Sequence, residues 1–380
     1  MKDRLKTCLL CGGELPQPFF SLPGMPSCAQ HIPQADELKD DVGIDLNLRQ
    51  CPLCGLVQLD CPPVSYYRDV IRAGGGTSTM RELRTRQYAH FIELCGLGGK
   101  RIVEIGCGQG EFLEMLEGFP VHGFGIENDP SLVAAAVAKG LSVREDFASA
   151  SGHVLADGPF DAFMQFNFIE HQPDPNAMVA CIRENLVEGG CGLVTAPSFE
   201  YIRNDCVYEI MRDHIAYYTE RTLRFLFEKN GFDILESGVI NRDTLYAIVR
   251  MQERFDAVSF GNNRADIKRQ LDAFVGERLA LGHRLAFWGA SHQCFTAAAF
   301  LADSAAIACI VDSAAFKQGR YSPVSHIPIV SPERLFAAPP DDLLILAPGY
   351  TDEIRKLVAE RCGGKVSVFA LRSGRIEVCP

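Results

Sequence analysis

The stretch that decides the fold is Val103-Glu104-Ile105-Gly106-Cys107-Gly108-Gln109-Gly110, followed by the run Phe112-Leu113-Glu114-Met115-Leu116. The β-branched residues before the first glycine predict a strand, and the helical spacing after the last glycine predicts the start of a helix. Alternating glycines between them permit a tight turn with positive φ and let a ligand approach the backbone closely. The stretch therefore predicts a strand, a turn and a helix arranged around a small ligand.

The acid before the turn indicates which ligand is bound. Glycine-rich turns of this kind also hold the pyrophosphate of dinucleotides, so the glycines alone are a weak signal. Glu104, two residues before Gly106, would repel a pyrophosphate but suits a ligand that carries an ammonium group. The turn of Gly106, Gly108 and Gly110 with Glu104 therefore favours S-adenosylmethionine over NAD.

Three later strands are predicted to end in polar residues at the edge where open α/β sheets bind ligands. The first, 121–126, is followed by an acid suited to ribose hydroxyls. After the second of these strands, a carboxylate could accept from an adenine amino group and an aromatic ring could pack on the base. The last of the three strands ends in an amide. These residues are Glu127, Asp146 with Phe147, and Asn167. Order and spacing resemble a class I S-adenosylmethionine-dependent methyltransferase, which implies a Rossmann-like α/β core; an ordinary glycine turn would not explain these strand ends.

Composition limits the class of protein. The 380 residues are long enough for two or three domains, and 47% apolar with 22% charged residues is typical of a globular chain. No apolar run reaches the ~18 residues of a membrane span, and the polar start has no signal-peptide core. The formal charge of −11 opposes binding to nucleic acid. We therefore expect a cytoplasmic protein that acts on a small molecule, with neither a membrane nor a nucleic-acid partner.

Four of the fifteen cysteines form two CxxC pairs, Cys8 with Cys11 and Cys51 with Cys54. Paired thiolates at this spacing can share one tetrahedral zinc ion, and a site made of four cysteines is structural. Reduced thiols without metal are the alternative, whereas a redox CxxC would need a thioredoxin-like context that is missing here. We expect a structural zinc ion with a small sheet of strands beside it.

The chain is expected to form three domains: a zinc-binding domain over 1–73, a methyltransferase domain over 74–252 and a Rossmann-like domain over 253–380. The glycine triplet Gly74-Gly75-Gly76 predicts a linker at the first boundary. The last domain repeats the alternation of strands and helices in a smaller parallel sheet. Its turn at Gly289 lacks companion glycines, which favours a domain without a cofactor of its own.

Together these segments resemble the sugar C-methyltransferases that act on nucleotide-linked 4-keto-deoxy sugars in deoxysugar biosynthesis. Members of that family have a tyrosine, one intervening residue and then Glu-His in their catalytic region. The matching positions here are Met211, Asp213 and His214, so the histidine is kept, the acid is shortened and the tyrosine is absent. His171 matches the other active-site histidine of the family.

The resemblance implies a carbanion mechanism. A carbon next to a ketone can lose a proton to a base, and the resulting enolate can attack the methyl group of the donor. We expect His214 to be the base, Asp213 to orient it, and His171 to donate to the developing enolate oxygen.

Further residues are candidates for binding the substrate. Lys317 and Arg320, near His326, would suit a diphosphate, although basic residues of this kind are often simply solvated. Tyr67 could stack on the nucleotide base, as could Tyr66, or either could belong to the core.

Three other functions stay open. An O- or N-methyltransferase acting on a sugar or natural product is the strongest, because Met211 replaces a catalytic tyrosine. A ribosomal-RNA methyltransferase with a zinc site is opposed by the acidic charge. A non-catalytic binding module would keep the fold and the ligand but form no product.

Overall fold

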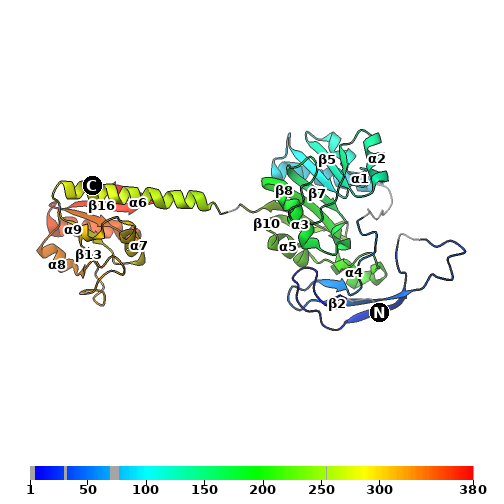
Figure 1. Cartoon of the computed structure of the whole chain (residues 1–380), viewed down its shortest axis with the longest axis horizontal. Helices are drawn as coiled ribbons and strands as arrows, with labels where there is room; N and C mark the ends of the chain where they lie inside the picture. The colour runs from blue at the N-terminus through cyan, green and yellow to red at the C-terminus, as the bar shows by residue number, and fades with distance from the viewer. Residues whose placement is uncertain (1–4, 30–31, 69–76, 254, 380) are drawn as a thin grey trace. The chain divides into compact units, whose positions relative to one another are not determined.

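The structure is a computed structural model, which describes residues 5–29, 32–68, 77–253 and 255–379. It divides into two compact units, Met1–Glu253 and Arg254–Pro380 (Figure 1). The glycine triplet that predicts a linker, 74–76, lies outside the described residues. The further division of the first unit into two domains stays a prediction.

The first unit is built on a seven-stranded sheet with the order β10-β11-β8-β7-β4-β5-β6. The five strands from β4 to β8 are parallel to their neighbours, whereas β11 is antiparallel to both β8 and β10. The strands are β4 (Arg101–Ile105), β5 (His122–Glu127), β6 (Val143–Glu145), β7 (Phe160–Phe166), β8 (Leu186–Pro197), β10 (Phe232–Ile240) and β11 (Thr244–Met251). From β4 the chain adds β5 and β6 on one side of the sheet, and it then adds β7 and β8 on the other side. The order of the strands therefore reverses between β4 and β7, and the carboxyl ends of these two strands flank the crevice where such sheets bind ligands.

Helices connect these strands. They are α1 (Ser78–Cys95), α2 (Pro130–Ala138), α3 (Pro175–Glu184), α4 (Phe199–Asp205) and α5 (Glu220–Lys229), with the short 3-10 segments η1 (Leu113–Gly118), η2 (Ile169–His171) and η3 (Val207–Glu209). The helix expected after the glycine turn forms only as the short 3-10 segment η1. It ends there because Phe119, which precedes Pro120, has an extended backbone. A residue that precedes proline disfavours the helical region, which ends the segment early.

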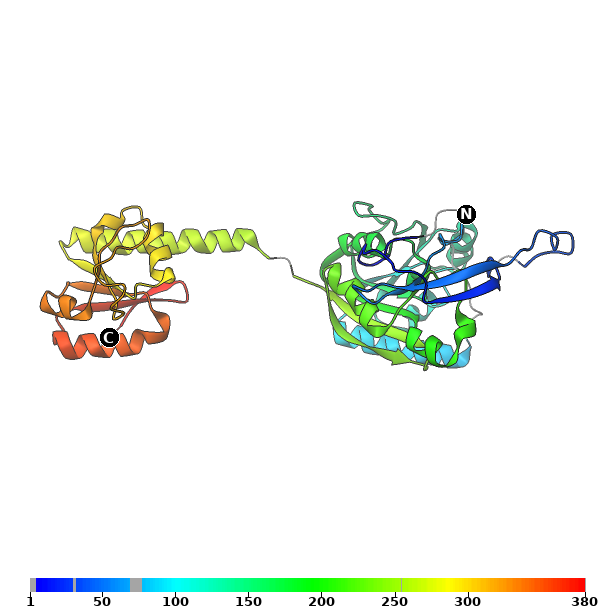
Figure 2. The same ribbon diagram turned by 90° about the horizontal axis from the view of Figure 1, so that it is seen from below.

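A second sheet of the first unit has the order β1-β2-β3-β9 and is antiparallel throughout. Its strands are β1 (Phe20–Met25), β2 (Ile44–Gln50), β3 (Val57–Leu59) and β9 (Ala216–Tyr217). β9 comes from the insertion between β8 and α5, so the histidine-bearing segment completes the cysteine-bearing sheet. Leu46 and Leu48 of β2 belong to one buried cluster with Phe199 and Ile202 of α4, and both views show these blue and green elements together (Figures 1 and 2).

The second unit contains a six-stranded sheet with the order β14-β13-β12-β15-β16-β17. Its strands are β12 (Leu285–Trp288), β13 (Ile307–Val311), β14 (Ile329–Val330), β15 (Asp342–Ile345), β16 (Ser367–Arg372) and β17 (Arg375–Val378). Its helices are α6 (Ala257–Ala280), α7 (His292–Phe300), α8 (Pro332–Ala337) and α9 (Thr351–Cys362), with 3-10 segments η4 (Ser304–Ala306) and η5 (Pro348–Tyr350). The sheet is parallel except for β17, which pairs antiparallel with β16. The expected parallel sheet therefore carries an antiparallel edge.

Packing explains the glycine after β12. Gly289 has φ +104°, and a Cβ atom there would lie 2.9 Å from the Cβ atom of Ala347.

Within the described part of the chain, no helix is long and apolar enough to cross a bilayer.

Candidate active site

The glycine turn lies at the carboxyl end of β4 in a conformation that requires glycine. Gly106, Gly108 and Gly110 have φ of +72°, +58° and +81°. The carboxylate of Glu127, at the end of β5, accepts hydrogen bonds from the backbone N–H of Gly108 and of Asp129, both at 2.9 Å. Glu127 thus braces the turn, and each of its oxygens retains a second lone pair for a ligand hydroxyl.

A narrow pocket runs beside this turn. Its lining residues come from the ends of β4, β5 and β6 and from the segment after β7, and they include Gly106, Glu127, Asp146, Phe147 and Phe168. The pocket brings together four residues that the sequence assigns to the methyl donor, and it assigns three of them, Glu127, Asp146 and Phe147, to the adenosine of that donor. A ligand with a ribose and a purine fits this combination of carboxylates and aromatic rings.

Asp146 and Phe147 are held in place at the rim of the pocket. Asp146 Oδ1 accepts from the N–H of Phe147 at 2.7 Å and lies 2.6 Å from His153 Nε2. The ring of Tyr67 meets Phe147 edge-on at 6.3 Å between centroids, and the guanidinium of Arg68 lies 5.2 Å from the Phe147 centroid. Tyr67, expected to contact the substrate base, therefore lies against the pocket expected to hold the donor.

Two buried ionisable side chains, those of Glu104 and Arg84, lie close enough to interact electrostatically. Glu104 is 3% exposed, and burial raises the pKa of its carboxyl to about 8 although Arg84 opposes the shift. Arg84, from α1, is 4% exposed and its guanidinium lies 3.9 Å from the centroid of the Phe166 ring. Glu104 Oε2 and Arg84 Nε are buried and have no hydrogen-bond partner among the described residues. One unused acceptor and one unused donor fit the ammonium and carboxylate of an amino acid.

Arg84 was missed by the sequence analysis, although a signal for it exists. The buried face of α1 consists of Arg84, Tyr88 and Phe91, at the spacing of one helical face. A basic residue on an otherwise aromatic buried face is unusual and suggests a ligand for its charge.

Asn167 follows β7 in the left-handed region, with φ +46°. Its Oδ1 accepts from Thr195 Oγ1 at 2.7 Å, and Thr195 Oγ1 also lies 3.4 Å from a terminal nitrogen of Arg84. This chain of contacts links the end of β7 to Arg84.

The two histidines expected to be catalytic meet in space. His171 belongs to η2 and His214 precedes β9; their ring centroids are 4.8 Å apart and the rings are nearly perpendicular. His171 Nδ1 lies 2.9 Å from the backbone oxygen of Asp213, and burial lowers its pKa. Burial, together with His171, lowers the pKa of His214 to about 3, and His214 Nδ1 has no partner in the described chain. Both imidazoles are therefore neutral at physiological pH.

Asp213 has a different environment from the one expected. Its carboxylate accepts from the Tyr66 hydroxyl at 2.7 Å and from the N–H of Ala29 at 2.8 Å. It thus fastens the N-terminal segment to the histidine loop, and neither of these hydrogen bonds involves His214. Tyr66 thus places a phenol hydroxyl beside Asp213. Met211 occupies the position at which the sugar C-methyltransferases have a tyrosine.

The acid that faces both histidines is Glu170, to which the sequence analysis gave no role. It is 2% exposed, and its Oε1 lies 3.8 Å from His171 Nε2 and 4.0 Å from His214 Nε2. Burial raises the pKa of its carboxyl to about 8.

The four cysteines of the CxxC pairs form a compact cluster, in which all sulfur atoms lie within 4.8 Å of one another. Cys8 and Cys54 are 3.4 Å apart between their Sγ atoms, and so are Cys11 and Cys51. Four sulfurs around one zinc ion at about 2.3 Å would be separated by about 3.8 Å, so the cluster fits this metal. Burial raises the pKa of Cys8 to about 11, and a cation would reverse that shift.

The basic residues expected to bind a diphosphate lie in the second unit. Lys317 Nζ forms an ion pair with Asp312 Oδ2 at 2.9 Å, whereas Arg320 and His326 are exposed. The ion pair offsets part of the positive charge that a diphosphate would meet.

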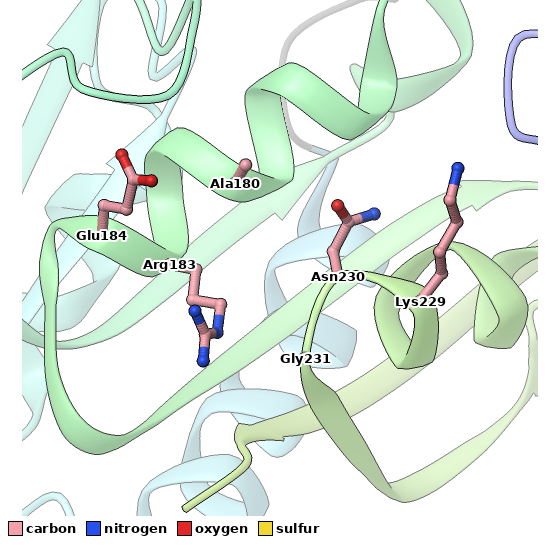
Figure 3. Close-up of a pocket in the computed structure, with 6 residues that line it drawn as sticks. All are labelled: Ala180, Arg183, Glu184, Lys229, Asn230 and Gly231. Carbon is pink, nitrogen blue, oxygen red and sulfur yellow. The ribbon is translucent and has the colours of Figure 1, made fainter. Parts of the chain in front are cut away.

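A separate open pocket lies where α3 and α5 end, and no expected site residue lines it. Figure 3 shows the side chains that line it, which are charged or polar apart from Ala180. The lining residues are Ala180, Arg183, Glu184, Lys229, Asn230 and Gly231.

Two known families match separate parts of the chain. Residues 80–237 match a methyltransferase domain, and residues 249–369 match the C-methyltransferase C-terminal domain. The chain is therefore an S-adenosylmethionine-dependent methyltransferase that carries the C-terminal domain of C-methyltransferases.

Most of its length is similar to C-methyltransferase NovU of Streptomyces niveus, with 24% identity over 389 aligned positions, which cover 91% of this chain and 90% of that protein. A ubiquinone biosynthesis O-methyltransferase of Xanthomonas oryzae is 34% identical over 123 positions, which span 31% of this chain and about half (52%) of that enzyme. The crystal structure of an S-adenosylmethionine-dependent methyltransferase from Clostridium acetobutylicum covers 46% of this chain and 92% of that one, with 11% identity and a TM-score of 0.38.

Proposed function

We propose that the enzyme methylates a carbon beside the ketone of a nucleotide-linked 4-keto-deoxy sugar through an enolate. The observation that carries the proposal is the pair of neutral, buried imidazoles, His171 and His214. Phe168, which lines the donor pocket, lies only three residues before His171. Transfer of a methyl group to carbon requires a carbon acid to lose its proton, and a neutral imidazole can accept one.

Each group has a proposed role. His214 Nδ1, buried and unpartnered in the described chain, would take the proton from carbon. His171 would stabilise the enolate oxygen, where charge develops during the reaction. Asp213 would hold Tyr66 and the N-terminal segment over the histidines, since its carboxylate bonds to both. Tyr66 thus places a hydroxyl near the catalytic loop.

The donor would be held by the glycine turn, by Glu127 and Asp146 at its adenosine end, and by Glu104 and Arg84 at its amino acid end. When bound, S-adenosylmethionine supplies an electrophilic methyl group. These last two side chains orient the ligand, because each buried group has an unused polar atom. Closure of the narrow pocket around the adenosine would exclude water from the methyl group.

The four-cysteine cluster would hold a structural zinc ion. Zinc binding to such a site can contribute on the order of 10 kcal/mol to folding. Because β9 joins β3, the same ion would stabilise the sheet that holds the His214 loop.

For the substrate, we propose that Lys317, Arg320 and His326 contact the diphosphate of the nucleotide. Arg320 and His326 are exposed and can reach a ligand, while Lys317 would exchange its partner Asp312 for phosphate.

Methylation of oxygen or nitrogen on a sugar or natural product is the second candidate. It is favoured by Met211, which cannot supply a phenol, and by the O-methyltransferase similarity over 123 aligned positions. Such a reaction needs no carbon acid, so it would leave the hydrogen beside the ketone in place.

The test is His214→Asn, with the exposed His122→Asn as a matched control. We expect the first variant to lose methylation by at least about 100-fold while S-adenosylhomocysteine still binds within about threefold of the wild type. The control should keep full activity. Methylation at the wild-type rate in His214→Asn would contradict the assignment of the base.

A further inference from the structure

Glu170 is a buried acid without a role in either sheet. Its backbone oxygen accepts from the N–H of Ile215 at 3.0 Å, but its side-chain Oε2 is buried and has no partner within the described part of the chain. A buried carboxyl that lacks partners lowers stability unless it remains protonated or serves another group. The groups that face it are His171, His214 and the buried phenol of Tyr218.

The tautomer of His171 follows from its hydrogen bond. A carbonyl oxygen can only accept, so the contact of 2.9 Å with the backbone oxygen of Asp213 places a hydrogen on Nδ1. A neutral His171 then has its lone pair on Nε2, which lies 3.8 Å from Glu170 Oε1. Two lone pairs that face each other in a dry interior repel, so a proton belongs between them. The raised pKa of Glu170 agrees with a carboxyl that holds this proton at rest.

His214 lies near the same carboxylate oxygen. Its Nε2 lies 4.0 Å from Glu170 Oε1, and its Nδ1 is free of partners in the described chain. A base with one ring nitrogen free and the other directed at a carboxyl is the arrangement of the catalytic triad. The separations are about 1 Å longer than hydrogen bonds, and such contacts often tighten only when substrate binds.

We propose that Glu170 is the positioning carboxyl of the base and couples His214 to His171 by proton transfer; this rests on the enolate mechanism proposed above. When the substrate C–H bond breaks, its electron pair stays on carbon as the enolate and its proton forms the Nδ1–H bond of His214. The Nε2–H proton of His214 moves to Glu170 Oε1, and the proton of Glu170 moves to His171 Nε2. The positive charge then resides on His171.

This transfer resolves two difficulties. Burial leaves His214 weakly basic, and the relay removes the positive charge from it. A neutral His171 also has no hydrogen on Nε2 to donate, and the relay supplies one as the enolate oxygen develops. Asp213 faces His171 with a backbone oxygen, which stabilises the imidazolium.

The test compares Glu170→Gln and Glu170→Asp with the wild type and with the exposed Glu188→Gln as a control. Glutamine has the same shape but cannot pass a proton. We measure exchange of the hydrogen beside the ketone with deuterium, with S-adenosylhomocysteine bound, across pH 6 to 10, together with methylation.

We expect Glu170→Gln to lose about 100-fold to 10,000-fold in kcat while KM and ligand binding stay within about threefold, and Glu170→Asp to recover part of the rate. Because the relay needs a protonated Glu170, wild-type exchange should decline above about pH 8, and this limb should be missing in Glu170→Gln.

Three outcomes would overturn the proposal. In one, Glu170→Gln exchanges at the wild-type rate with an unchanged pH profile. In another, both variants lose ligand binding and thermal stability together, which would indicate a purely structural role. In the last, metal analysis finds an ion beyond that of the four cysteines and Glu170→Gln loses it, which would make Glu170, His171 and His214 a metal site. Failure of the enolate mechanism is distinguishable, because the wild type itself would then show neither exchange nor a C-methyl product.

Discussion

Binding of S-adenosylhomocysteine should release a proton from Glu104. The carboxyl is buried and its pKa is about 8, so at pH 7 about nine-tenths of the free protein has it protonated. The ligand ammonium requires the carboxylate, so binding at pH 7 should release about 0.9 proton per chain. Below pH 8 the affinity should fall about tenfold for each pH unit, and from pH 8 up to the pKa of the ligand's own amino group it should be nearly constant.

Isothermal titration calorimetry in two buffers with different ionisation enthalpies measures this release directly. Glu104→Gln should abolish both the release and the pH dependence, and at pH 8 it should weaken binding by about 10-fold to 100-fold because a charged hydrogen bond is lost. The exposed Glu117→Gln serves as the control and should behave as the wild type. If the wild type releases no proton at pH 7, or if Glu104→Gln releases as much, the buried carboxyl does not bind the ammonium.

Three further predictions concern other parts of the first unit. Arg84→Gln should weaken S-adenosylhomocysteine binding by about 10-fold to 100-fold by calorimetry, because the ligand carboxylate loses a charged partner; an unchanged Kd would contradict this. Cys11→Ser should lose bound zinc by atomic absorption and lower the melting temperature, and full zinc content would refute the four-cysteine site. Gly110→Ala should lower the free energy of unfolding in urea by about 1 to 3 kcal/mol, because Gly110 has φ +81° and a Cβ atom there would lie 2.3 Å from a methyl carbon of Leu141. The control variant Gly118→Ala should change this free energy by less than about 0.5 kcal/mol, because a Cβ atom there meets no atom within 4 Å.

The central sheet could be predicted because its signals are local. An apolar run followed by Gly106 predicts the end of β4, and Glu127 and Asn167 mark the ends of β5 and β7 at the same edge. Parallel strands place their carboxyl ends together, so residues distant in sequence could be assigned to one pocket.

Other features could not be predicted, because they depend on contacts between distant segments. β9 has only two residues, and β1 is largely exposed, so neither has a hydrophobic pattern of its own. Asp213 is next to His214 in the sequence, but it lies in a turn where its carboxylate bonds to Tyr66 and Ala29, and the carboxyl near His214 is that of Glu170 from another loop. Arg84 could have been found from the buried face of α1.

The most direct test of the central claim is mass spectrometry of the wild-type enzyme in heavy water, with S-adenosylmethionine and a panel of nucleotide-linked 4-keto-6-deoxy sugars. We expect a product that gains one methyl group on carbon, with deuterium exchange at the carbon beside the ketone when S-adenosylhomocysteine replaces the donor. Methylation on oxygen or nitrogen without any such exchange would contradict this expectation.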